Sequence, residues 1–165
     1  MLKLRQANLG DLMYVACGIE SGEKEQMAAF SGAPFSIDCC VKEALNYVGP
    51  KWAIVDDTNE QVAVAVGGLT GCRPGVVRSW FMARPEAWAK GSNITALVAG
   101  VVAGTLQSSA HRVETVCLAS REQARRWYEK VGLSYEATLK NYGASGEDAV
   151  LYVALRGPKQ TGVTH

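Results

Sequence analysis

Histidine is scarce in this chain, and disulfide-forming patterns are absent. Only two of the 165 residues are histidines, and one of them, His165, is the last residue. His111 alone is too little for a histidine-based metal site or for a Cys/His nucleophile pair, so we expect no metal. The five cysteines are an odd number without C-x-x-C spacing, and the close pair Cys39 and Cys40 are chain neighbours. We therefore expect reduced and mostly buried thiols.

An excess of charge and a long apolar run are lacking as well. Lysine and arginine total 17 against 16 acidic residues, which argues against a nucleic-acid partner. The longest apolar stretch, residues 96–104, is much shorter than the roughly 20 residues of a membrane span, and the polar start predicts no secretory signal. With 48% hydrophobic residues, the length predicts one domain over residues 1–156, followed by a polar tail at 157–165.

Hydrophobic periodicity predicts alternating elements along the chain. We expect helices capped by Asn8, Ser36 and Ser120, the last closed by Gly132, and a further helix from about 92 to 107. Residues 23–34 have a mixed pattern that predicts a short helix and a loop, and residues 83–90 predict a loop. The expected strands lie at 2–5, 51–56, 61–69, 76–82, 112–118, 134–139 and 149–155. The order βααβββαβαββ predicts an α/β (α+β) fold, with a mixed central sheet and helices on both faces.

Two segments carry a resemblance to a known family. The first, RPEAWAKGSNITAL at 84–97, joins a predicted strand to a predicted helix, and the second, SREQARRWYEKVGL at 120–133, is a short helix that ends at a glycine. With this element order, the chain resembles the GCN5-related N-acetyltransferase (GNAT) family over about residues 2–155. The resemblance implies acetyl-CoA as the cofactor.

In that family, backbone N–H groups at the start of the first segment's helix hold the pyrophosphate of coenzyme A. The family's pattern of Gln or Arg, Gly, and Gly or Ala falls here on Trp88, Gly91 and Asn93, so one position of three is kept. The resemblance places the cofactor against Met82, Ala83, Lys90, Gly91, Ser92, Asn93 and Ile94. A helix cap without any ligand remains the alternative for this loop.

The second segment implies the acid–base chemistry. It places Tyr128 near the sulfur of coenzyme A, where a phenol with a pKa near 10 can return a proton to the leaving thiolate; a core tyrosine is the alternative. For the general base, the candidates are Glu114 and His111, each of which could instead be an exposed cap or edge residue. A backbone amide around residues 81–83 is the expected donor to the thioester oxygen.

Residues 76–136 are also similar to acetyltransferase-like proteins of short-tailed bacteriophages, in which an aromatic Trp-Phe pair, here Trp80 and Phe81, precedes a glycine-poor helix start. That branch includes internal virion proteins, although two core aromatics would give the same pattern. This resemblance leads us to expect a virion-associated structural protein with a degenerate coenzyme A site, in contact with other virion proteins and located in the virion or host cytoplasm. The alternative is an acetyl-CoA-dependent N-acyltransferase acting on a primary amine or a protein N-terminus. Homo-oligomer formation stays open.

Overall fold

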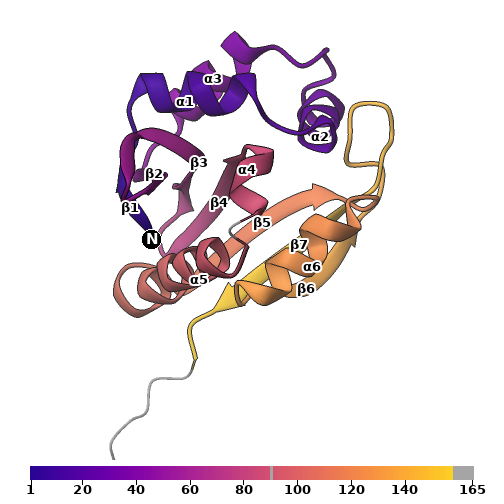
Figure 1. The fold of residues 1–165 in the computed structure, drawn as a ribbon. Helices are drawn as coiled ribbons and strands as arrows, with labels where there is room; N and C mark the ends of the chain where they lie inside the picture. Colours follow the sequence, from indigo (N-terminus) through magenta and orange to yellow (C-terminus); the bar gives the residue numbers. More distant parts are fainter. Residues whose placement is uncertain (90, 158–165) are drawn as a thin grey trace, which may run out of the picture.

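The computed structural model describes residues 1–89 and 91–157, in which one seven-stranded sheet carries helices on both faces (Figure 1). The sheet order is β1-β2-β3-β4-β5-β7-β6. The strands are β1 (Leu2–Gln6), β2 (Lys51–Asp56), β3 (Asn59–Arg73), β4 (Val76–Ala83), β5 (Arg112–Leu118), β6 (Ser134–Leu139) and β7 (Ala149–Leu155). The helices are α1 (Leu9–Cys17), α2 (Ser21–Ser31), α3 (Ile37–Asn46), α4 (Pro85–Trp88), α5 (Gly91–Ser108) and α6 (Glu122–Lys130). The expected fold class is confirmed.

Two observed helices, α2 and α4, are absent from the predicted element order. α2 is a full helix that ends at Gly32 in the left-handed conformation (φ 72°), where the sequence predicted a short helix and a loop. Its apolar residues do not form a clear stripe, so periodicity gave no signal. α4 replaces a predicted loop and has Pro85 at its first position, where a missing N–H costs nothing.

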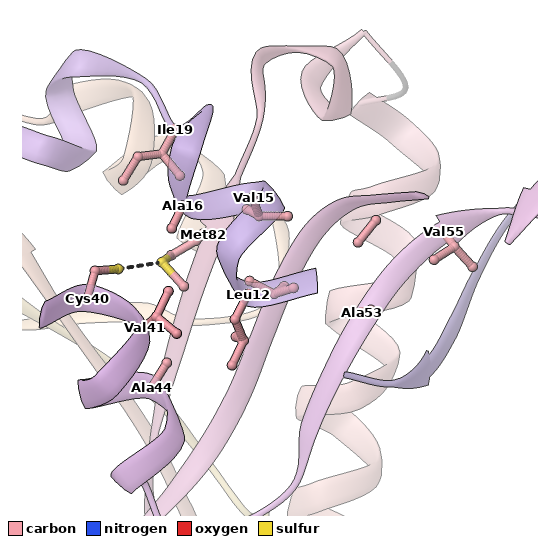
Figure 2. Close-up of a cluster of buried hydrophobic side chains, with 12 residues drawn as sticks. Leu12, Val15, Ala16, Ile19, Cys40, Val41, Ala44, Ala53, Val55 and Met82 are labelled. Atoms are coloured by element: carbon pink, nitrogen blue, oxygen red, sulfur yellow. Dashed lines mark hydrogen bonds between the residues drawn. The ribbon is translucent and has the colours of Figure 1, made fainter. Parts of the chain in front are cut away.

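Successive side chains of β2 point to opposite faces of the sheet and pack under different helices. Ala53 and Val55 join a cluster with Leu12 of α1 and Val41 of α3 (Figure 2), whereas Ile54 packs in a separate cluster with Ile94 of α5. This period of two is what a strand covered on both sides requires. The sheet is therefore a central layer between two sets of helices.

The predicted helix ends are partly confirmed. The side chains of Asn8 and Ser36 each accept a backbone hydrogen bond at the start of α1 and α3, and Gly132 follows α6 with φ of +94°. In contrast, α6 begins after Arg121, without a side-chain cap from Ser120. No helix in the described part of the chain is long and apolar enough to cross a bilayer.

The cysteines are free, but the expectation that most are buried was wrong. Cys17, Cys39 and Cys72 are exposed, and Cys40 and Cys117 are buried. The Cys40 thiol lies 3.2 Å from the sulfur of Met82, beneath α3 (Figure 2).

The two central strands separate along their length. β4 and β5 run parallel and pair at only three positions, from Val76 opposite Arg112 to Arg78 opposite Glu114. Beyond these pairs β4 continues to Ala83 and β5 to Leu118, and the two strands diverge (Figure 1). We call this opening the β4–β5 gap.

Candidate functional site

A cavity of about 790 Å³ lies at the β4–β5 gap. Its walls come from α2, α3, β4, α4, β5 and α6, so segments from most of the chain converge on it. This volume is within the range of small-molecule and cofactor sites. We call it the main pocket.

Side-chain hydroxyls link the two strands where backbone pairing stops. The Ser79 hydroxyl donates to the carbonyl of Glu114 (3.4 Å), and the Thr115 hydroxyl donates to the carbonyl of Ser79 (3.3 Å). These bonds hold the strands at the beginning of the gap without closing it. Ser79 and Thr115 both line the main pocket.

Backbone N–H groups of β4 face the gap. Backbone groups along a strand alternate between its two edges. The N–H of Arg84 binds Val64 on the β3 side, and the N–H of Ala83 donates to a carboxylate oxygen of Glu23 (3.4 Å) on the other side. By this alternation the N–H of Phe81 points into the gap, where β5 no longer pairs with β4.

Glu23 is a buried carboxylate in the wall of the main pocket. It lies in the first turn of α2 and is 8% exposed. Its other carboxylate oxygen is 3.8 Å from the guanidinium of Arg121. Burial raises the pKa of Glu23 to about 7, against the opposing effects of the Arg121 charge and the Ala83 hydrogen bond. A group that exchanges a proton near neutral pH is suited to act as a general base.

Tyr128, the candidate acid, lies on α6 and lines the same pocket. Burial raises the pKa of its phenol above the usual value, the nearby Cys117 adds to this, and Arg121 and a hydrogen bond with Thr115 act against it. The phenol therefore stays protonated at neutral pH. Its ring lies 5.6 Å from that of Tyr152, so the position is both part of the pocket and packed against the sheet.

Glu114, the candidate base, has a different environment. It is 5% exposed, and its carboxylate accepts hydrogen bonds from Arg78 (2.8 Å) and Arg112 (3.0 Å). Desolvation would raise the pKa of Glu114, but the two arginines outweigh it and lower the pKa. A carboxylate held this way is a poor proton acceptor. His111 is exposed and contacts Gly75, where β4 and β5 are still paired.

The expected cofactor residues separate into two groups. Met82 packs in the core under α1 and α3, and Ala83 is buried with its N–H on Glu23. α5 begins at Gly91, so the backbone of Gly91, Ser92, Asn93 and Ile94 forms its first turn, with the Ile94 side chain in the core. Lys90 lies outside the described residues.

Three aromatic rings narrow the gap beside the start of α5. Trp127 of α6 lies 4.9 Å from Phe81 and 5.3 Å from Trp88 of α4, measured between ring centroids. Its indole N–H donates to the hydroxyl of Thr95 in α5 (3.1 Å). The first turns of α5 are thereby tied to the wall of the main pocket. We call Phe81, Trp88 and Trp127 the aromatic cluster.

Sequence reasoning missed Glu23 and the aromatic cluster. Glu23 stands in a segment with a mixed pattern, and its partners Ala83 and Arg121 are distant in the chain. Nothing local in the sequence marks that carboxylate as buried. Within residues 1–89 and 91–157, no group of three or more metal-ligating side chains comes together.

The comparisons with known proteins bear on the fold. No protein-family model and no curated protein sequence matches the chain. Among solved structures, a mutant spermidine N-acetyltransferase from Vibrio cholerae is similar over 94% of both chains, at 16% identity and a TM-score of 0.68. A GNAT-family acetyltransferase from Bacillus anthracis covers 94% of this chain and 95% of its own, at 16% identity and a TM-score of 0.67.

A putative acetyltransferase from Salmonella typhimurium, solved with acetyl-CoA, covers 96% of both chains at 12% identity and a TM-score of 0.66. At these identities the likeness concerns the fold alone. These matches contain no link to a virion protein. The mixed seven-stranded sheet, with its flanking helices, is the fold of the GNAT acetyltransferases.

Proposed function

We propose that this protein is an N-acyltransferase that moves an acyl group from an acyl-CoA to a primary amine. The observation that carries the proposal is the β4–β5 gap, where a buried carboxylate with a pKa of about 7, a protonated phenol and an unpaired edge of β4 line one cavity. Amine acylation needs a base, an acid and an N–H donor for the thioester oxygen. Glu23, Tyr128 and the Phe81 N–H have these properties.

The residues around the gap fit the thioester end of an acyl-CoA. The Phe81 N–H would bind the carbonyl oxygen, and the first turn of α5 would offer its free amides to phosphate oxygens. Trp80 lines the main pocket, and its Nε1 is a buried donor without a partner in the described part of the chain. A bound molecule with an acceptor group could satisfy it.

The aromatic cluster sets a limit on that fit. Trp88 stands where the family has a glutamine or arginine, and its ring packs on Phe81 and Trp127. Neither ring neighbour supplies a positive charge. Binding of the phosphates would therefore depend on backbone amides more than on a side chain at position 88, which favours modest affinity.

The protons can be followed on the chain's own residues. Glu23 takes a proton from the ammonium of the acceptor, which frees the nitrogen lone pair. When bound, the acyl-CoA supplies an activated acyl carbon, so that a C–N bond forms as the C–S bond breaks. Tyr128 holds the proton that the departing sulfur takes up, and the proton that the new amide nitrogen sheds restores the phenol.

Carboxylates outnumber cations in the lining of the main pocket, which favours a cationic acceptor. Glu20, Glu23 and Glu43 line it together with Arg121 and with Arg78, which is bound to Glu114. The Tyr47 hydroxyl donates to Glu43 (2.6 Å) and fixes that carboxylate. The Tyr47 ring lies 5.7 Å from that of Trp80, so carboxylates and aromatic faces occur together, a combination that attracts ammonium groups. The Vibrio cholerae neighbour is named for spermidine, which makes a small polyamine a reasonable first substrate.

No observation on the described residues supports the virion role that the narrower resemblance led us to expect. The pocket is open and carries acid–base groups, whereas a relic site would need neither. The three solved structures compared above are named as acetyltransferases. We therefore place the enzyme first and the virion component second.

An assay of thiol release tests the proposal. The protein is incubated with acetyl-CoA and with spermidine, a simple monoamine or a short peptide with a free N-terminus. We expect amine-dependent thiol release, reduced about 100-fold or more by Glu23→Gln. Glu25→Gln, an exposed position on the same helix, is the matched control and should leave the rate unchanged. Absence of thiol release with every amine, together with no binding of acetyl-CoA by calorimetry, would contradict the proposal.

A further inference from the structure

A second, smaller cavity adjoins the main pocket. It has a volume of about 70 Å³, and six residues line both cavities: Ser79, Trp80, Phe81, Thr115, Trp127 and Tyr128. These residues are the rim of the β4–β5 gap. The smaller cavity therefore opens from the same place where the proposed reaction occurs.

The walls that the smaller cavity does not share are apolar. Val98, Val101 and Val102 of α5 form one side, with Val131 and Leu133 after α6. Besides the Tyr128 phenol, the rim hydroxyls are those of Ser79 and Thr115, which already donate to backbone carbonyls of the neighbouring strand. A cavity with these walls disfavours water, which needs two or more polar partners.

Two glycines of β3 border this space, and neighbouring atoms occupy the position of a side chain at each of them. A Cβ on Gly67 would lie 2.9 Å from the carbonyl oxygen of Trp80, and a Cβ on Gly68 would lie 2.7 Å from that of Pro50 and 2.8 Å from the Trp80 indole. Both positions line the smaller cavity. The close approach of β3 and β4 therefore depends on residues without side chains.

We propose that the smaller cavity receives the acyl chain of the donor and that the protein prefers acyl groups longer than acetyl. This inference rests on the proposed function, because it assigns the part of the donor that enters beside Phe81 and Tyr128. The occupant is a short aliphatic chain, which the apolar walls favour. An acceptor amine is excluded from this cavity, because it carries a charge that these walls cannot pair.

The volume sets the chain length. A water-sized group occupies about 30 Å³, so a cavity of about 70 Å³ has room for about two methylenes. Two methylenes beyond acetyl make a butyryl group. Each buried methylene is worth a factor of about four in affinity, and the two together predict about 15-fold tighter binding of butyryl-CoA than of acetyl-CoA.

Calorimetric titration of the full chain with a series of donors tests this inference. The probes are acetyl-, propionyl-, butyryl-, hexanoyl- and octanoyl-CoA. We expect affinity to rise through butyryl and to fall for octanoyl, which exceeds the space. Equal affinities along the series, or tightest binding of acetyl-CoA, would overturn the inference and leave the proposed function standing. Failure of every donor to bind would overturn both.

Substitutions at Val98 sharpen the result because they change the cavity in opposite directions. Val98→Leu fills part of the space and should lower the ratio of butyryl to acetyl affinity to near one. Val98→Ala enlarges the space and should move the optimum toward hexanoyl. Ala103→Val, on the exposed side of α5, is the control and should keep the ratio of the unchanged protein. The wild-type series decides the question even where a variant folds poorly, and a shared optimum in all three variants would contradict the assignment.

Discussion

At the residue scale, the pKa of Glu23 is set by burial, which raises it, and by Arg121 and the Ala83 hydrogen bond, which lower it. The carboxylate is buried, and the cation paired with it, Arg121, is 3.8 Å away, which is too distant to compensate for the lost hydration. By contrast, Asp11 is also buried but accepts two short bonds from Arg5 (2.6 and 2.7 Å), and its pKa is lowered despite desolvation. A buried carboxylate therefore stays ionised when it is paired with a close guanidinium, as Asp11 is, and can exchange a proton near neutral pH when it is not, as Glu23 can.

Stability should report the raised pKa of Glu23 directly. Between pH 4.5, its usual pKa, and about 7, its pKa in the fold, the folded chain holds a proton that the unfolded chain has released. The free energy of unfolding should therefore fall as pH rises through this window, by at most about 3 kcal/mol. Urea denaturation at a series of pH values measures this slope.

Glu23→Gln supplies the comparison for that slope. Glutamine cannot ionise, so the variant should show a smaller fall of stability between pH 4.5 and 7, and Glu25→Gln should behave like the unchanged protein. Parallel curves for all three proteins would mean that Glu23 has an ordinary pKa and is no candidate for the base.

The phenol of Tyr128 gives a second prediction. Tyr128→Phe keeps the ring contact with Tyr152 and removes the proton that the leaving sulfur would take. We expect kcat with acetyl-CoA and an amine to fall about 100-fold, with little change in the KM of the donor. Steady-state kinetics measure both constants. A variant with full kcat would assign Tyr128 to packing, which is the alternative that the sequence left open.

At the element scale, the end of α6 depends on one glycine. Gly132 has φ of +94°, and a Cβ there would meet no atom within 4 Å. The cost of Gly132→Val therefore comes from the backbone alone, and we expect a loss of more than about 1 kcal/mol of unfolding free energy. Gly100, in the exposed middle of α5, is the matched control, where Gly100→Ala should stabilise the chain. Destabilisation by both substitutions, measured by urea denaturation, would contradict this reading of the helix end.

Elements with a clear hydrophobic period could be predicted from the sequence. Strands and helices with a clear period, such as β2 and α3, were placed within a few residues of their observed bounds. α2 was missed in part because its packing does not follow an apolar stripe. α4 was missed because a single turn beginning at Pro85 has too few residues for a period to appear.

At the scale of the whole molecule, the site is assembled by contacts that no local pattern contains. Glu23 reaches Ala83, and Trp127 reaches Thr95, across long stretches of chain. The resemblance supplied Tyr128 and the start of α5, because those positions belong to short motifs. It did not identify Glu23 or the aromatic cluster, because the positions of these residues depend on how α2, α4 and α6 pack against the sheet.

At the scale of the whole molecule, the proposed function requires that the β4–β5 gap binds an acyl-CoA. Backbone amide NMR during titration with acetyl-CoA tests this most directly, because each residue reports separately. We predict that the largest shifts occur at Phe81, at Thr115 and in the first turn of α5, with β6 at the sheet edge unchanged. Saturating acetyl-CoA without shifts at Phe81 and Thr115 would contradict the account.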